Sequence, residues 1–173
     1  MKTKIILSTI ILLLFISPAV SFAGVADDNA LAAVALYIDT SGRYVPGIDM
    51  LNKALNEVIR YKVNALFLGS EVQCGNEVLR DLKRCNVASA ADATPDALAA
   101  YAKARHVNYI ILLAVHPLDL TLDIKAYSSA ANTYIVDKTV TAPDGGAALS
   151  TLDSLSGLLG DELANVLTMI IRG

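Results

Sequence analysis

Two long apolar runs constrain the fold of this chain more than any other feature. Leu31 to Ile38 is LAAVALYI and Val107 to Val115 is VNYIILLAV. Turn-forming residues follow each run, Asp39-Thr40-Ser41-Gly42 after the first and His116-Pro117 after the second. A strand without a polar face has to be covered on both sides, which helices packed on a sheet achieve. We therefore expect two buried strands, with the second run at the centre of the sheet.

Helical periodicity separates these strands. Apolar residues recur at spacings of three and four from Ile48 onward, and again from Leu149 to Ile170. Gly75 to Arg84 has the same pattern over a shorter stretch. Thr94-Pro95-Asp96 predicts a helix start, because Thr can cap, Pro suits the first helical position and Asp suits the positive helix end; this helix runs to about Arg105. Ala65 to Leu68 (ALFL) is short and wholly apolar, and predicts another buried strand.

After Leu120 the periodicity changes to two. One set of alternating residues is apolar and the other largely polar, which predicts a strand with one face in solvent. The apolar set is Leu120, Leu122, Ile124 and Ala126, and the opposite set is Thr121, Asp123, Lys125 and Tyr127. Turn residues Ser128 to Asn132 and a second strand, Thr133 to Val140, complete a hairpin with Tyr134, Val136 and Val140 on its apolar side.

The order of elements is thus strand, helix, strand, two helices, three strands, helix. Crossover connections come first and antiparallel connections last, so the sheet should be mixed. The sequence predicts an α/β (α+β) fold, a single three-layer domain with helices packed on a sheet of about five strands.

The first residues have the layout of a secretory signal peptide. Lys2 and Lys4 precede the apolar run Ile5 to Ile16, and small residues end the segment at Ala23. We expect cleavage between Ala23 and Gly24, leaving residues 24–173 as one domain. The apolar run is shorter than the about 20 residues of a comfortable membrane span, so a retained anchor is the less favoured alternative.

Export without lipidation is the expected outcome. No cysteine follows the small residues, so nothing at this position predicts a lipoprotein, and the mature chain should be periplasmic or secreted with no stable membrane anchor. Loss of Lys2 and Lys4 reduces the basic residues from 14 to 12, against 17 acidic ones. Nucleic acid is therefore an unfavourable partner, since basic side chains supply most of its affinity.

Cys74 and Cys85 leave two alternatives open. An oxidising compartment favours a disulfide between them. An intact ten-residue helix between them would place its ends about 15 Å apart, whereas a disulfide needs Cα atoms within about 7 Å. Two free thiols are the favoured alternative.

No residue set predicts catalysis, a metal site or a cofactor. His106 and His116 should lie at opposite ends of one strand, too far apart for a shared ligand, and solvated strand ends are their expected role. Asp39-Thr40-Ser41-Gly42 is typical of a turn. Asp39-x-Ser41 together with Thr94 also resembles the metal-ion-dependent adhesion site of von Willebrand A domains. That site needs a second serine where this chain has Arg43, whose charge opposes a bound cation.

In its element order, the chain resembles a group of bacterial envelope domains. The group comprises the amino-terminal domain of TolB, the curli secretion protein CsgG and the penicillin-binding-protein activator LpoB. Ala104 to Leu112 (ARHVNYIIL) resembles the group's helix-end and strand pattern, with Asn108 where Asp is usual, and Leu122 to Lys138 resembles its hairpin. The resemblance implies envelope assembly and partner binding and supplies no catalytic residues. The channel-forming additions of CsgG are absent, so secretion activity is not implied.

Together these features predict a non-enzymatic accessory domain that binds another protein of the cell envelope and serves its assembly or maintenance. The alternative is a von Willebrand A-like adhesive domain with a degenerate metal site. A hydrolase or a small-ligand carrier is a further rival, which a deep polar pocket would favour.

Overall fold

The computed structural model describes residues 30–44, 46–67, 72–117, 119–141 and 148–172, with the backbone alone at 65–67 and 148–156. The expected cleavage site, Ala23–Gly24, lies outside these residues. The described elements, in chain order, are β1 (Ala32–Ile38), α2 (Ile48–Phe67), β2 (Val72–Cys74), α3 (Asn76–Arg84), the short 3₁₀ helix η1 (Ala90–Asp92), α4 (Pro95–Arg105), β3 (Tyr109–His116), β4 (Thr121–Ser128), β5 (Thr133–Thr141) and α5 (Ala148–Arg172). This is the predicted order, and it confirms the predicted fold class.

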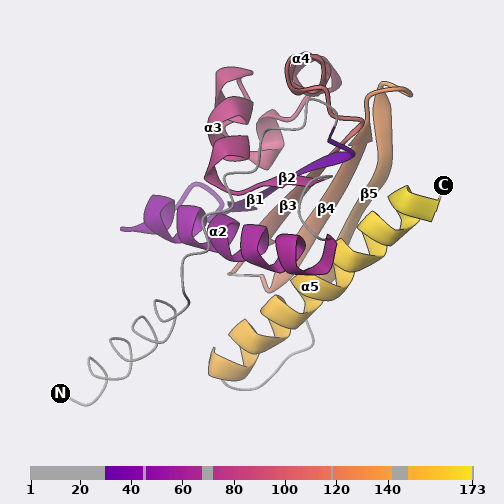
Figure 1. Ribbon diagram of the computed structural model, residues 1–173. Helices are drawn as coiled ribbons and strands as arrows, with labels where there is room; N and C mark the ends of the chain where they lie inside the picture. Colours follow the sequence, from indigo (N-terminus) through magenta and orange to yellow (C-terminus); the bar gives the residue numbers. More distant parts are fainter. Residues whose placement is uncertain (1–29, 45, 68–71, 118, 142–147, 173) are drawn as a thin grey trace.

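The strands form one mixed sheet in the order β2-β1-β3-β4-β5. β1 is parallel to both β2 and β3, whereas β4 is antiparallel to both of its neighbours, β3 and β5. β3 is central, as its apolar sequence predicts, and β5 ends the sheet on one side (Figure 1). Crossovers thus build the first half of the sheet and a hairpin meander builds the second.

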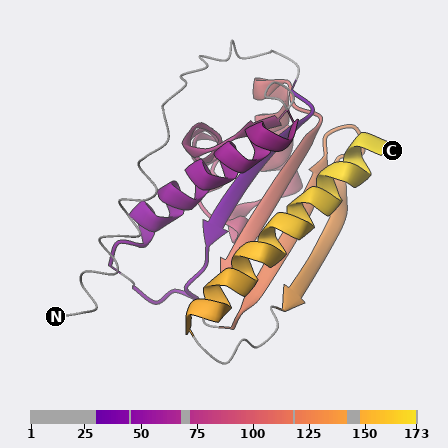
Figure 2. The same ribbon diagram turned by 60° about the horizontal axis from the view of Figure 1, so that its bottom comes forward.

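Helices cover both faces of the sheet and make three layers. α2 and α5 lie side by side on one face, where Ile59 and Leu167 are buried against the strands (Figure 2). α3 and α4 pack on the other face through buried residues that include Leu82 and Leu98. Both runs that define the sequence, β1 and β3, are buried from both sides as expected. Among the helices described, none is both long and apolar enough to cross a membrane.

α4 begins where the sequence predicts. Thr94 Oγ1 accepts a hydrogen bond from the backbone N–H of Ala97 at 3.3 Å, and Pro95 occupies the first turn. The helix ends at Arg105, and His106 follows in the left-handed conformation with φ 51°. The start of this element is thus the one that its capping residues predict.

The predicted strand at Ala65–Leu68 is wrong. α2 continues through Phe67, and the second strand is the three-residue β2 instead. Ile59 and Val63 are both buried, so the helical spacing continues to within two residues of the apolar run. A short apolar run is compatible with either a helix end or a strand, and periodicity cannot separate the two. β2 was missed because three residues carry too little pattern to detect.

The hairpin departs from strict alternation at one point. Ala126 pairs with Val136, whereas Tyr127 pairs with Tyr134, so β5 has one extra residue, Ile135, between these pairs. Such a β-bulge changes which face the following side chains occupy. Tyr134 therefore packs with the α3 and α4 side of the core, not on the predicted apolar side with Val136 and Val140.

The first strand of the hairpin also differs from expectation at its two ends. Leu120 lies before β4 with φ 54°, although it was expected to begin the strand. Tyr127 at the other end is fully buried rather than solvated. The half-buried face is thus limited to Thr121, Asp123 and Lys125.

Candidate functional site

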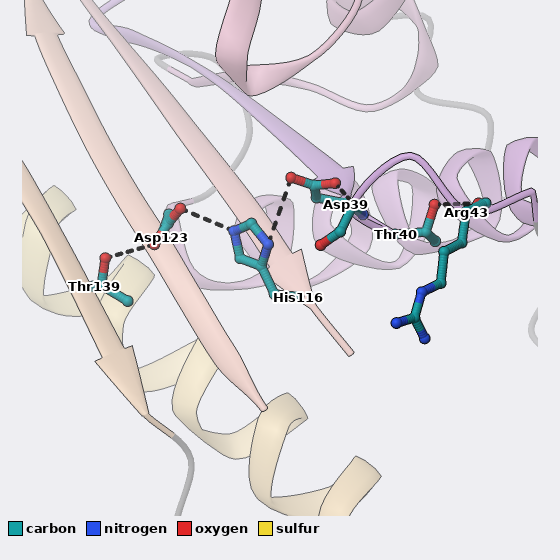
Figure 3. A network of polar contacts seen from close by, with 7 residues as sticks. Asp39, Thr40, Arg43, His116, Asp123 and Thr139 are labelled. Atoms are coloured by element: carbon teal, nitrogen blue, oxygen red, sulfur yellow. Dashed lines mark hydrogen bonds and ion pairs between the residues drawn. The ribbon is translucent and has the colours of Figure 1, made fainter. Parts of the chain in front are cut away.

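A row of polar side chains crosses four strands on the sheet face opposite α2 and α5 (Figure 3). His116 at the end of β3 is the centre of the row. Its Nε2 shares a hydrogen bond of 2.8 Å with Asp123 Oδ2 on β4, and its Nδ1 lies 3.5 Å from Asp39 Oδ2. On β5, Thr139 Oγ1 donates to Asp123 Oδ1 at 2.6 Å. Parallel pairing of β1 with β3 brings Asp39 to this end of the sheet, where its N–H donates to Val115 O at 2.9 Å.

The row favours an ionised carboxylate at Asp123. Burial acts to raise the pKa of this carboxyl. The hydrogen bonds from Thr139 and His116, together with the charges of His116 and Lys125, act in the opposite direction and outweigh burial. The pKa of Asp123 therefore lies below its ordinary value. Asp123 thus serves as a charged anchor joining three neighbouring strands.

The row has no arrangement suited to catalysis. A histidine acting as general base needs one ring nitrogen free to face a nucleophile or substrate. Here each nitrogen of His116 already faces a carboxylate. In the described part of the chain, no group of three or more His, Cys, Asp or Glu side chains is placed to hold a metal ion. The geometry suits a polar clamp across the sheet.

Asp39 also closes the turn after β1. Its Oδ1 accepts a hydrogen bond from Ser41 N at 2.7 Å, and Thr40 Oγ1 donates to Arg43 O at 2.6 Å. Ser41 and Gly42 have positive φ, 53° and 76°, so two left-handed residues complete the reversal. The segment is the turn that its composition predicts.

The adhesive alternative loses its structural basis. Von Willebrand A folds alternate strands with crossover helices, whereas β3, β4 and β5 follow one another antiparallel with no helix between them. The Asp39 carboxylate, which the metal-site hypothesis required to face a cation, accepts a hydrogen bond from the backbone N–H of Ser41 within the turn. The resemblance to that site was therefore a coincidence of turn residues.

Two aromatic side chains lie at the other end of the same face of the sheet. The rings of Tyr127 and Tyr134 meet edge to face at 6.1 Å, and Lys125 Nζ lies 5.7 Å from the Tyr134 ring centroid. The hydroxyl of Tyr134 donates to Ala93 O, next to η1, and that of Tyr127 donates to Asn132 Oδ1 at 2.7 Å. The polar face is thus bounded by the His116 row at one end and by this tyrosine pair at the other.

β5 gives the sheet an exposed edge. Within the described part of the chain it pairs with β4 on one side only, and each of its nine residues is exposed or half-buried. Ile135, the bulged residue, is 42% exposed. Lys138 Nζ forms an ion pair of 2.6 Å with Glu162, which ties the strand to α5. Residues Thr133–Thr141 are called the β5 edge below.

The two histidines differ in a way that the sequence did not indicate. His106 is exposed at the end of α4, and it lies at the opposite end of β3 from His116, as expected. His116 was expected to be solvated, and this was wrong, since its side chain is only 17% exposed. Strand pairing could have indicated the neighbours of His116. A residue ending β3 neighbours the residue after β1, and the hairpin register then sets it near a polar position of β4.

The cysteines lie on opposite sides of the sheet. Cys74 belongs to the core beneath α2 and α5, whereas Cys85 packs against the core beneath α3 and α4. α3 is an intact helix between them, and both thiols are free in the structure. Burial raises the pKa of the Cys74 thiol to about 12. The geometry favours two thiols, and their state in the exported protein remains a prediction.

A small apolar hollow lies between α2 and α5. Its volume is about 30 Å³, and residues of both helices line it, among them Ile59, Val63, Leu163 and Leu167. Space of this size holds about one water-sized molecule. It gives no support to a hydrolase or a ligand carrier.

No family model and no curated protein matches the chain. Among solved structures, it is similar to the LpoB C-terminal domain from Escherichia coli, with 13% identity, a TM-score of 0.39, and coverage of 67% of this chain and 83% of that one. It is also similar to lipoprotein GNA1162 from Neisseria meningitidis, with 16% identity, a TM-score of 0.43, and coverage of 83% and 99%. LpoB is one member of the group that the sequence resembles; the TolB and CsgG parts of that resemblance remain predictions.

Proposed function

We propose that this chain is a non-enzymatic binding domain that attaches to another protein of the cell envelope through the β5 edge and serves envelope assembly or maintenance. It would act in the periplasm or outside the cell after cleavage between Ala23 and Gly24. The observation that carries the proposal is the position of β5, which ends the sheet and, among the residues that the structure describes, pairs on one side alone.

An unpaired strand edge is a binding surface by its backbone chemistry. Its outward N–H and C=O groups can pair with an extended segment of another protein, while neighbouring side chains set specificity. Here the edge adjoins the polar face, where Lys125, Asp137 and Thr139 supply charged and hydroxyl groups. A partner strand would thus gain backbone hydrogen bonds and polar side-chain contacts together.

Proline substitution tests the backbone part of this proposal. In an antiparallel strand, successive residues direct their N–H groups alternately toward the neighbouring strand and away from it. One of Asp137→Pro and Lys138→Pro therefore removes an outward donor while leaving the β4–β5 ladder intact. The matched controls Asp137→Ala and Lys138→Ala remove the same side chains, including the ion pair with Glu162, and keep the N–H.

Each variant would be immobilised, checked for folding by circular dichroism, and used to capture partners from envelope extract with quantitative mass spectrometry. We expect a folded proline variant to capture the wild-type partner at least about tenfold less, and its alanine control to stay within about tenfold of wild type. Equal capture by all folded variants would exclude the β5 edge as the binding site.

A second arm separates this function from metal-dependent adhesion. Asp39→Ala removes the carboxylate that a metal site would need and leaves the β5 edge unchanged. We expect its capture to remain within about tenfold of wild type with or without Mg²⁺. Loss of capture on this change alone, or a requirement for Mg²⁺, would overturn the proposed function.

A further inference from the structure

The outer face of α2 is apolar, although this helix already buries its other face against the sheet. Met50, Ala54, Val58 and Tyr61 recur at spacings of four, four and three, and Leu51 lies beside them. Met50 is 75% exposed and Tyr61 is 71% exposed. These five residues are called the α2 outer stripe.

A stripe of this kind needs an explanation that isolated exposed residues do not. A helix that packs on a sheet ordinarily turns polar residues to solvent, and contiguous exposed apolar groups mark a contact surface. The inner face of α2 is fully used, since Ile59 and Val63 are buried and the Asn56 side chain is 0% exposed. None of the five residues of the outer stripe belongs to the core in the part of the chain that the structure describes.

The charged residues beside the stripe would meet residues of opposite charge if a second copy were related to the first by a two-fold rotation. Lys53 and Glu57 lie one turn apart on the same flank. When two such helices pack antiparallel, each flank meets the same flank of the other helix in reverse order. With Ala54 opposite the second copy's Val58, Lys53 of each copy faces Glu57 of the other.

The carboxylate of Glu57 is already held in position for this contact. Its Oε2 pairs with Arg60 at 2.6 Å, and its Oε1 accepts from Asn76 N at 3.1 Å. A fixed carboxylate loses little freedom on association, which favours binding. Asp49 and Glu57 alternate with basic residues along the helix, a pattern that suits a protein of matching charges better than an anionic lipid surface.

We propose that two copies of this chain associate through their α2 outer stripes. The two helices pack antiparallel, and the two-fold axis passes between them midway between Ala54 and Val58. Two-fold dimers are the commonest closed assemblies, and a self-complementary surface is what they require. α2 contacts β1 and β2, which lie toward the opposite edge of the sheet from β5. The dimer would therefore leave both β5 edges free, and it does not depend on the function proposed for them.

Sedimentation equilibrium of the mature chain tests the association. We expect a monomer–dimer equilibrium with a micromolar dissociation constant, and Ala54→Glu should raise that constant by about tenfold or more, because it places a charge in the contact. Thr168→Glu is the matched control, since Thr168 is exposed on α5 and lies outside the stripe. It should leave the equilibrium unchanged. A wild-type chain that stays monomeric, or a dimer that folded Ala54→Glu does not weaken, would overturn the proposal.

Cross-linking tests the orientation. In a Cys85→Ser background, chains with Ala54→Cys are mixed with chains with Val58→Cys and treated with a short bismaleimide. Antiparallel pairing predicts that mixed cross-links outnumber those between identical chains. Parallel packing would instead favour cross-links between identical chains. Mixing the protein with phosphatidylglycerol vesicles tests the other occupant, since binding through the stripe without dimerisation would identify a lipid surface. Either result would refute the antiparallel dimer.

Discussion

At the scale of single residues, Asn56 has a role that no sequence pattern indicated. β2 pairs with β1 only from Ala32 to Val34, so the backbone of Leu36 extends beyond its neighbour strand. The Asn56 side chain takes the place of that neighbour. Its Oδ1 accepts from Leu36 N at 2.9 Å and its Nδ2 donates to Leu36 O at 2.7 Å. A buried asparagine thus completes the hydrogen bonding of a buried strand.

Asn56→Ala should reduce the free energy of unfolding by about 2 to 4 kcal/mol, because it leaves two buried backbone groups without partners. Asn64→Ala, an exposed position on the same helix, should change it by less than about 0.5 kcal/mol. Urea unfolding followed by circular dichroism measures both values. Similar losses in the two variants would show that the Leu36 contacts do not contribute.

The Asp123 carboxyl should titrate at a lower pH than an ordinary aspartate, in part because Thr139 donates to it. Thr139→Val should therefore move the pKa of Asp123 upward, and Thr133→Val, an exposed threonine of the same strand, should not. Carbon-detected NMR titration of the carboxyl reports the midpoint. An unchanged midpoint in Thr139→Val would contradict the role of this hydrogen bond.

The same shift has a defined effect on stability. The folded pKa is lower than the unfolded pKa of about 3.9, so ionised Asp123 stabilises the fold above that value. This contribution is lost as pH falls through the folded pKa. The stability difference between wild type and Thr139→Val should therefore be constant near neutral pH and decrease in acid, as urea unfolding across pH would show.

At the scale of elements, local signals succeeded where one segment carries the whole pattern. α4 was predicted from Thr94-Pro95-Asp96, and α5 from its apolar stripe. β2 was missed because its three residues carry too little pattern, and the bulge at Ile135 was missed because it depends on pairing with another strand. The end of α2 was misassigned, since apolar residues there suit two periodicities equally.

α3 also decides the chemistry of the cysteines. With this helix intact, Cys74 and Cys85 cannot form a disulfide, so thiol titration of the exported, denatured and unreduced protein should find two thiols. In the folded protein, Cys85 should react first, because Cys74 is buried and its pKa is raised to about 12. Finding no thiols would mean that α3 is broken in the exported protein.

At the scale of the whole molecule, export is the property that the first residues predict. Intact mass of the protein recovered from the envelope fraction should correspond to a chain that begins at Gly24, within a few residues. A membrane-bound chain that retains Met1 would contradict export by cleavage, and an added lipid mass would contradict the expectation of an unlipidated chain.

The sequence by itself determined the mixed sheet with helices packed on it, the central place of β3, and every element of the order except the position of β2. These follow from periodicity and capping, which act between residues close along the chain. Only the tertiary structure decided that Asn56 would replace a missing strand and that His116 would join Asp39 to Asp123. Those contacts join residues far apart in the sequence, and each becomes favourable only when packing has already buried the groups and brought their partners within hydrogen-bonding distance.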